Sequence, residues 1–140
     1  MPYSAASPVT EAIYARLQDA TLLATLTGGV HDDVPQTPTY PFAWLEMFRE
    51  QDARGLGTGG LPEIEFRTHV FSQFGGMAQA QEANRLIVGL LKDYALTVTG
   101  YAMCGHIFYR ETVTLPDEEI NGIKCHEAVS IFTVFVEDNA

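Results

Sequence analysis

Apolar side chains recur at helical spacing in two stretches of the chain. The first stretch runs from Ser7 to Leu26 and shows one stripe with a slight drift before its last two members: Val9, Ile13, Leu17, Leu23 and Leu26. Such a stripe predicts an amphipathic helix. Ser7 followed by Pro8 predicts the N-cap and the first helical position, and Gly28-Gly29 predicts the end of the helix.

The second helical stretch begins at Gly75-Gly76 and continues to about Tyr94. Its apolar side consists of Met77, Ala80, Ala83, Ile87, Leu90, Leu91 and Tyr94. This spacing is typical of a helix that packs one face on a core. We therefore predict a second helix over this stretch.

Alternating or aromatic-rich segments predict the strands. Residues 64–74 alternate well, with Ile64, Phe66, Thr68 and Val70 on one face and Glu65, Arg67, His69 and Phe71 on the other. This pattern predicts a half-buried strand. Further strands are predicted over residues 42–49, 96–98, 101–115 and 123–136, and residues 30–34 are a short strand or an extended arm.

Three connections have distinct compositions. Prolines at 35, 38 and 41 predict a stiff, extended connector, because proline fixes φ and biases the preceding residue to extended backbone. Trp44, just after it, is expected to anchor its strand in the core. Residues 50–62 contain four glycines and predict a flexible loop. Residues 116–122 predict an acidic turn that ends on Asn-Gly and joins the last two strands.

The order helix, strands, helix, strands predicts an α+β fold, with a mainly antiparallel β-sheet and two α-helices packed on one face. The 140 residues are most simply a single domain, residues 1–140. Within it, residues 1–7 are expected to be a flexible N-terminus.

The composition is globular. Apolar residues make up 46% of the chain and charged residues 19%, which argues against disorder. No apolar run approaches the roughly 20 residues that a membrane helix needs. The N-terminus has no basic and apolar regions of a signal peptide. We therefore expect synthesis in the cytosol and no membrane partner.

The net charge is −10, from 18 acidic and 8 basic side chains. A surface of that sign repels phosphate, so sequence-specific DNA binding is not expected. The same charge would suit a wall that DNA slides past without sticking. It is also explained by carboxylates that simply keep a protein soluble, and both interpretations stay open.

Two groups of residues carry the letters of known sites without their context. Residues 55–60 match the glycine spacing of a dinucleotide-binding loop, but a proline and a strand follow where that loop requires a helix. Cys104, His106, Cys125 and His126 are zinc-ligand types. In a hairpin closed near residues 117–121, the two pairs would lie roughly 25 to 30 Å apart along the strands. Metal–ligand bonds are about 2.0 to 2.3 Å long, so the pairs cannot form one site.

His31-Asp32-Asp33 is a third candidate. Neighbouring side chains point to opposite sides of an extended chain, so Asp32 and Asp33 would not share a site. Loop capping by the two aspartates is the simpler explanation. We therefore expect no catalytic residue, no metal site and no cofactor in this chain.

Several short motifs together resemble a known family. They are Glu11-Ala12-Ile13-Tyr14-Ala15-Arg16-Leu17, Val30-His31-Asp32-Asp33-Val34-Pro35 leading to Tyr40-Pro41-Phe42, His69-Val70-Phe71-Ser72 before Gly75-Gly76 and an alanine-rich helix, and the closing strand Ser130 to Glu137. With these motifs, residues 8–137 resemble the small phage tail-completion proteins, also called tail terminators or head–tail joining proteins.

The resemblance implies structural work without catalysis. Such proteins form a ring, typically a hexamer, on the end of the tail tube of a tailed bacteriophage or phage-like particle. The implied partners are further copies of the chain, the tail-tube protein and the head connector or stopper protein, while DNA passes through without specific binding. The implied location is the head–tail junction of the virion, after assembly in the host cytoplasm.

A ring requires two complementary flanks on each protomer, because a heterologous interface repeated by rotation closes on itself. The possible interface loops are acidic and contain Asp52, Glu63, Asp117, Glu118 and Glu119. The alternative is a monomeric, non-catalytic binding module that uses an exposed sheet edge.

Overall fold

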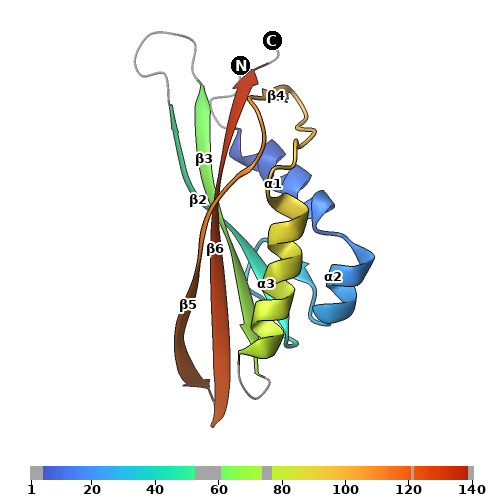
Figure 1. Cartoon of the computed structure of the whole chain (residues 1–140), viewed down its shortest axis with the longest axis vertical. Coiled ribbons are helices and arrows are strands. Elements are labelled where there is room, and N and C mark those ends of the chain that lie inside the picture. The colour runs from blue at the N-terminus through green and yellow to red at the C-terminus, as the bar shows by residue number, and fades with distance from the viewer. Residues whose placement is uncertain (1–4, 53–60, 74–76, 121, 139–140) are drawn as a thin grey trace.

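A computed structural model describes residues 5–52, 61–73, 77–120 and 122–138. Two helices, three strands, a third helix and three more strands follow one another along the chain (Figure 1). In order they are α1 (Ala6–Arg16), α2 (Ala20–Thr25), β1 (Val30–His31), β2 (Phe42–Asp52), β3 (Pro62–Ser72), α3 (Ala78–Leu91), β4 (Tyr101–Met103), β5 (Phe108–Ile120) and β6 (Ile123–Asp138).

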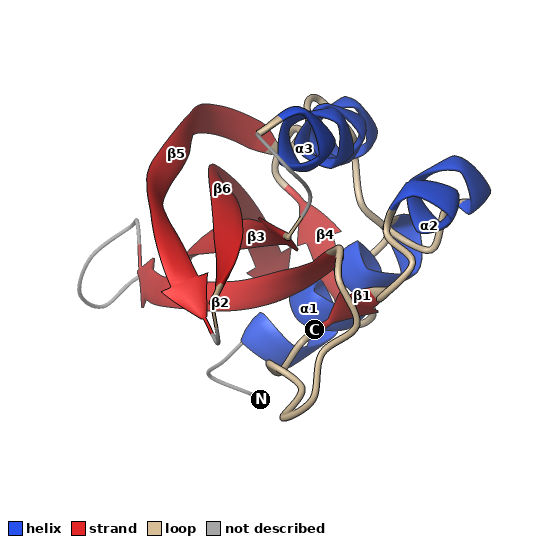
Figure 2. Cartoon of the chain, turned by 90° about the horizontal axis from the view of Figure 1, so that it is seen from below, coloured by secondary structure: helices blue, strands red, loops and turns tan. Residues whose placement is uncertain are grey.

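The strands form one sheet in the order β1-β2-β3-β6-β4, and β5 also pairs with β6. All of these pairs are antiparallel except β1–β2, which is parallel. The sheet is curled, and β5 curves strongly along its length when the strands are viewed end-on (Figure 2). The predicted α+β class therefore holds as a mainly antiparallel sheet accompanied by a few helices.

A cluster of buried apolar side chains links the helices to the sheet. The predicted apolar face of β3 is buried, and its Phe66 stacks on Phe132 of β6 with ring centroids 5.1 Å apart. Glu65 and His69 on the other face are buried too, so β3 is more enclosed than the predicted half-buried strand. The helices add Val9, Ile13, Ala80, Ala83, Ile87 and Leu91 to the same cluster. Removing this surface from water is the main force that holds the helices on the sheet.

The first predicted helix is two helices. The chain leaves helical geometry after Arg16, and the Asp19 side chain accepts a hydrogen bond from the Leu22 amide at 3.2 Å, which caps α2. Ser7 is not the N-cap: α1 begins at Ala6, with Ala5 in the cap position. Ala6 and Ser7, predicted to belong to a flexible terminus, are therefore helical, while residues 1–4 of that terminus lie outside the described residues. Leu22, rather than Leu23, is fully buried, because the break changes the phase of the stripe.

The proline-rich connector does not run straight away from α2. Its two ends lie side by side: the Gly28 amide donates to the Pro41 carbonyl at 2.8 Å, and the Ala43 amide donates to the Gly29 carbonyl at 2.9 Å. A Cβ on Gly28 would lie 1.7 Å from the Thr39 carbonyl oxygen, so this approach requires glycine. The connector is therefore a closed loop, which brings β1 into parallel pairing with β2.

The last two strands meet later than predicted. β5 continues to Ile120, where it pairs with Ile123, and Gly122 in the intervening turn has φ +80°. The predicted acidic turn at residues 116–122 is wrong for its first five residues, which belong to β5. The chain also divides where one strand was predicted, because β4 ends at Met103 and β5 begins at Phe108.

Other predicted boundaries shift by a few residues. The second predicted helix is α3, which ends at Leu91, and Val98 forms only an isolated bridge with Tyr101 where a strand was predicted. The strands β2 and β3 extend into the predicted glycine-rich loop, of which residues 53–60 lie outside the described residues, as do Gly75 and Gly76. Among the described helices, none is long and apolar enough to cross a membrane.

Candidate interaction surfaces

Two long strands have a side along which no described strand pairs. The thirteen-residue β5 pairs with β6 along one side, and no described strand pairs with its other side. At the opposite end of the sheet, β1 pairs only with Ala43 and Trp44 of β2, and no described strand lies along the outer side of Leu45 to Arg49, which we call the open stretch of β2. Beyond it, the Glu50 carboxylate accepts a hydrogen bond from the Ala5 amide. Unpaired edges of this kind are templates for strands of another chain.

Irregularities divide the β5 edge. The register with β6 shifts between Tyr109 and Glu111 and again between Leu115 and Glu118. Between these shifts, the stretch from Glu111 to Leu115 pairs regularly. We call this stretch the regular β5 edge.

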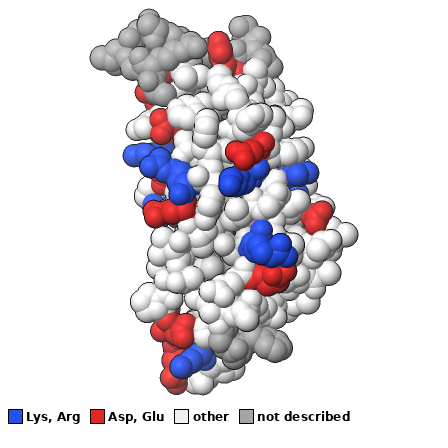
Figure 3. All heavy atoms as spheres, in the orientation of Figure 1, with Lys and Arg blue, Asp and Glu red and all other residues white. Residues whose placement is uncertain are grey.

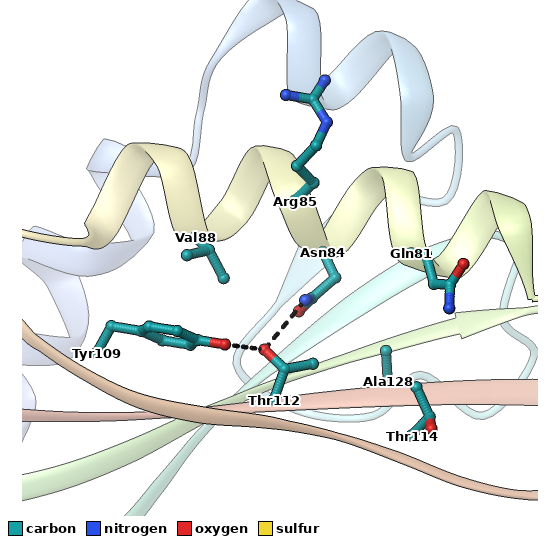
Figure 4. A pocket seen from close by; sticks show the side chains of 8 residues that line it. All are labelled: Gln81, Asn84, Arg85, Val88, Tyr109, Thr112, Thr114 and Ala128. Atoms are coloured by element: carbon teal, nitrogen blue, oxygen red, sulfur yellow. Dashed lines mark hydrogen bonds between the residues drawn. The ribbon is translucent and has the colours of Figure 1, made fainter.

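A pocket of about 320 Å³ lies beside this edge, between β5 and α3 (Figure 4). Its lining is largely uncharged and consists of Gln81, Asn84, Arg85, Val88, Tyr109, Thr112, Thr114 and Ala128. The one charged lining side chain, Arg85, is paired with Glu82 at 2.7 Å. In Figure 4 it points away from β5, so neutral amide and hydroxyl groups dominate the pocket.

A hydrogen-bond network forms the inner wall of the pocket. Asn84 donates to Thr112 Oγ1 at 3.3 Å, Thr112 and Ser130 hydroxyls lie 2.9 Å apart, and Ser130 donates to Asn84 Oδ1. The amide oxygen only accepts, so Ser130 uses its proton there and Thr112 must donate to Ser130. Tyr109, 2.5 Å from Thr112 Oγ1, is then the donor. The network is self-consistent and ties α3 to β5 and β6.

A charged cluster surrounds His69 of β3, on the face of the sheet opposite the pocket. His69 is 8% exposed, and its two ring nitrogens lie 2.7 Å from a Glu127 oxygen and 2.8 Å from a Glu46 oxygen. Burial alone would lower the pKa of His69, but the hydrogen bonds to Glu127 and Glu46 outweigh it and raise the pKa above its ordinary value. The ring also stacks on Trp44, with centroids 4.5 Å apart. Trp44 is half-buried beside this cluster, so the prediction that it anchors β2 in the core is wrong.

Further charged and aromatic side chains continue along this side of the sheet. Glu65 accepts hydrogen bonds from Arg49 and Arg67, at 3.3 and 3.4 Å. The Arg67 guanidinium lies 3.6 Å from the centre of the Phe48 ring. Phe48 is 48% exposed and Phe108, on β5, is 51% exposed. This side therefore combines paired charges with exposed aromatic rings.

The acidic residues singled out from the sequence lie in two separate places. Asp52 and Glu63 lie on β2 and β3 next to residues 53–60, whereas Asp117, Glu118 and Glu119 lie on β5 at the hairpin. These ends are at opposite ends of the long axis (Figure 1). All five belong to strands instead of loops, because β2, β3 and β5 are each longer than predicted.

The cysteine and histidine pairs are far apart. The Cys104 amide donates to the Phe135 carbonyl, whereas Cys125 pairs with Glu118 ten residues earlier along β6, a separation of about 34 Å at strand spacing. His126 Nδ1 lies 2.6 Å from Asp117 Oδ1. In residues 5–52, 61–73, 77–120 and 122–138, no group of three His, Cys, Asp or Glu side chains could hold a metal ion.

Cys125 is also a poor nucleophile. Burial, and then the negative charge of Glu127, raise the pKa of its thiol, although a hydrogen bond to Tyr40 acts in the other direction. Burial and Cys125 in turn raise the pKa of the Tyr40 hydroxyl. A raised thiol pKa lowers the fraction of reactive thiolate.

Sequence reasoning missed the two polar clusters. Asn84 interrupts the apolar stripe of α3 three residues before Ile87, and a polar residue in that position was an available signal. His69 was placed on the correct face of its strand, but its partners come from β2 and β6, 23 and 58 residues away in sequence. Nothing in the local pattern identifies them.

Solved structures with a similar fold were found. A chain from the virion of a native gene transfer agent particle has a TM-score of 0.77 at 22% sequence identity, and the match covers 97% of this chain and 99% of that chain. A second solved structure, which carries no functional name, has a TM-score of 0.65 at 13% identity and covers 99% of each chain. At these identities the likeness establishes a shared fold. No curated protein matches the chain.

The sequence also matches a family model over residues 11–136, and the model describes tail completion protein gp17. This match spans nearly the whole chain, including both polar clusters and β5. It confirms the resemblance that the short motifs indicated. The chain belongs to the tail completion protein gp17 family.

Proposed function

We propose that this chain is a structural protein of the virion of a tailed bacteriophage or phage-like particle, where it forms a hexameric ring that ends the tail tube and joins it to the head connector. The family match over residues 11–136 carries the proposal. The similar chain in a gene transfer agent virion supports it, because a particle of that kind contains this fold. In this proposal the ring is assembled in the host cytoplasm and resides at the head–tail junction.

Contacts between copies would use strand edges and one side of the sheet. We take α1 and α3 to cover a single face of the sheet, since their buried side chains join the cluster around Phe66 and Phe132. The other face, with Trp44 and the exposed ring of Phe48, is then available to neighbouring copies. The open stretch of β2 lies at the margin of that face and supplies one of the two flanks that a ring requires.

DNA would pass through the ring without specific binding. A net charge of −10 per copy makes an annulus of several copies strongly negative, with a field screened over about 8 Å at physiological salt. The side of the monomer in Figure 3 mixes basic and acidic side chains at mid-height and again at the lower end. We assign a lumen-facing role to the carboxylates at the strand ends, with Asp52 and Glu63 at one end and Asp117 to Glu119 at the other. The alternative is that these carboxylates lie on the outer wall and affect solubility alone.

The proposal requires no catalysis, metal or cofactor. A ring that stops polymerisation acts through shape and surface complementarity, for which buried apolar area and paired edges are sufficient. The paired side chains of His126 and Asp117 are explained by strand packing at the hairpin, where β5 shifts register.

The test is reconstitution on purified tail tubes. We expect the protein to form rings on tube ends, visible by negative-stain electron microscopy, and to stop further tube growth. A free protein that is monomeric by light scattering is compatible with the proposal, because the tube can template the ring. Tubes that stay bare and continue to grow in the presence of excess protein would refute it.

The second candidate is a monomeric binding module that uses an exposed sheet edge. The open edge of β5 favours it, because strand addition needs nothing more than such an edge and neighbouring pockets. The two candidates differ in self-assembly. A chain that remains monomeric on tail tubes but binds an extended peptide would support the module and exclude the ring.

A further inference from the structure

The regular β5 edge, Glu111 to Leu115, has different chemistry on its two sides. Thr112 and Thr114 pair with Ser130 and Ala128 and lie on the side of the α3 pocket. Val113 is on the opposite side and is 38% exposed. An added strand would place alternate side chains on these two sides, because successive residues of a strand point to opposite faces.

The pocket side accepts small neutral polar groups. Its inner wall is the network of Asn84, Thr112 and Tyr109, which is fixed by its own hydrogen bonds. Ala128, fully buried, is the floor, and the exposed Gln81 and Thr114 are at the mouth. Amide and hydroxyl side chains fit such a lining, since Gln81 and Thr114 at its mouth can exchange hydrogen bonds with them at no cost in charge burial.

The other side accepts apolar groups. Val113 and Leu115 are 38% and 37% exposed there, and Phe108 follows just beyond the first register shift. Side chains of an added strand would remove these apolar surfaces from water. The partner strand should therefore alternate apolar residues with Ser, Thr, Asn or Gln.

The charge around the regular β5 edge favours another protein over a second copy of this chain as the bound partner. The edge begins at Glu111, directly after Arg110, and Asp117, Glu118 and Glu119 follow it at the hairpin, so the hairpin end is the acidic one. Residues 45–52 of β2 carry three carboxylates and one arginine, so a second copy that paired its β2 with the hairpin end of β5 would set acidic residues against acidic residues. Like charges on directly paired strands are destabilising. A strand flanked by lysine or arginine is complementary instead.

We propose that the regular β5 edge and the α3 pocket together bind an extended segment of another protein, with basic flanks and alternating apolar and neutral polar side chains. The identification of that protein as another component of the particle rests on the proposed function. The open stretch of β2 and the opposite sheet face remain for contacts between copies.

The test uses the full-length protein and a synthetic peptide, Lys-Lys-Val-Thr-Val-Asn-Val-Lys-Lys, in a fluorescence-anisotropy titration. A peptide with glutamate in place of every lysine is the charge control and should bind at least about tenfold more weakly. N-methylation of every second residue should abolish binding in one of the two alternate patterns and spare it in the other, because only one set of amides faces β5. Equal binding of the lysine and glutamate peptides, or no effect of either N-methyl pattern, would overturn the proposal.

A matched pair of variants locates the site. Thr114→Tyr fills the mouth of the pocket, and Thr99→Tyr makes the same change at an exposed position away from it. We expect Thr114→Tyr to weaken the lysine peptide at least about tenfold, while Thr99→Tyr leaves affinity unchanged. Circular dichroism establishes that both variants are folded. A folded Thr114→Tyr protein with unchanged affinity would overturn the assignment.

Assembly on tail tubes tests this inference separately from the proposed ring. We expect Thr114→Tyr rings to form on tail tubes but to join fewer heads. Loss of the rings themselves would show that β5 joins copies of the chain, which overturns this inference and keeps the proposed function. Normal joining by a variant that no longer binds the peptide would overturn it as well. Peptide binding by a wild-type protein that never forms rings would refute the ring and leave strand binding at β5 standing.

Discussion

The two sides of the sheet stabilise the same strands with different chemistry. On the side of Phe66 and Phe132, both rings are fully buried, and Asn84, Thr112 and Ser130 form a neutral hydrogen-bonded network. The buried Thr68 hydroxyl beside Ser130 has no hydrogen-bond partner among the described residues. On the other side, a histidine is held between two carboxylates and Trp44 is only half-buried. The difference follows from access to water, because charged groups are costly in a closed core and affordable where solvent still reaches the carboxylates.

The largest predicted effect contrasts one aromatic ring from each side. Phe132→Ala should lower the free energy of unfolding by about 3 to 5 kcal/mol, because the ring is fully buried and leaves a cavity. Trp44→Ala should cost about 1 to 2 kcal/mol, since a half-buried ring loses less apolar contact. Urea denaturation of both variants is the measurement. Equal losses would mean that the two sides are equally enclosed.

The next effect concerns the charged cluster. His69→Phe keeps a ring on Trp44 but leaves Glu46 and Glu127 without their cation. The side chains of these glutamates are 28% and 23% exposed, so we expect a loss of about 2 to 3 kcal/mol, somewhat below that of a fully buried pair. Adding Glu46→Gln to His69→Phe should recover part of it in the same denaturation assay. If the double variant recovers no stability, the loss in His69→Phe comes from altered packing and not from the carboxylates.

The neutral network should give a smaller effect. Asn84→Ala leaves Ser130 and Thr112 with unmatched hydrogen bonds and should cost about 1 to 2 kcal/mol. Gln81→Ala, on the exposed side of the same helix, is the control and should change stability by less than about 0.5 kcal/mol. The Asn84 loss should be the same from pH 5 to 8. A loss that varies with pH would mean that an ionisable group takes part.

The smallest effect is the pH dependence of the charged cluster. The raised pKa of His69 means that its pairing stabilises the fold fully below about pH 6.5, its unfolded value, and that this contribution is lost as pH rises through the folded pKa. The slope cannot exceed about 1.4 kcal/mol per pH unit for a single proton. Thermal denaturation from pH 5 to 9 should show this decline in the wild type and less of it in His69→Phe. Equal pH profiles of stability in the two proteins would mean that groups other than His69 cause the decline.

Local pattern determined much of the fold. The alternation of β3 correctly predicted that Ile64, Phe66, Thr68 and Val70 share one buried face, because a strand has a period of two whatever its neighbours are. The apolar stripe of α3 and the mainly antiparallel class were predicted for the same kind of reason. The family was also indicated by short motifs, which follow one another along nearly the whole chain.

Tertiary structure decided the features that join distant segments. The connector closes because Gly28 meets Pro41 across a loop whose length no local preference sets. The hairpin between β5 and β6 extends to Ile120 because a register shift absorbs Pro116 and keeps both strands in pairing. Propensity is a statement about neighbouring residues, and these outcomes depend on contacts made after the chain has folded back.

The candidate interaction surfaces were decided mainly by the tertiary structure. The sequence by itself determined the acidic charge, the family and the absence of any recognisable catalytic motif. Only the folded chain brought Asn84 to Thr112 and His69 to Glu127, and only the sheet order left one side of β5 open. The physical reason is that polar clusters and strand edges are defined by which segments become neighbours, and hydrophobic periodicity specifies faces without specifying neighbours.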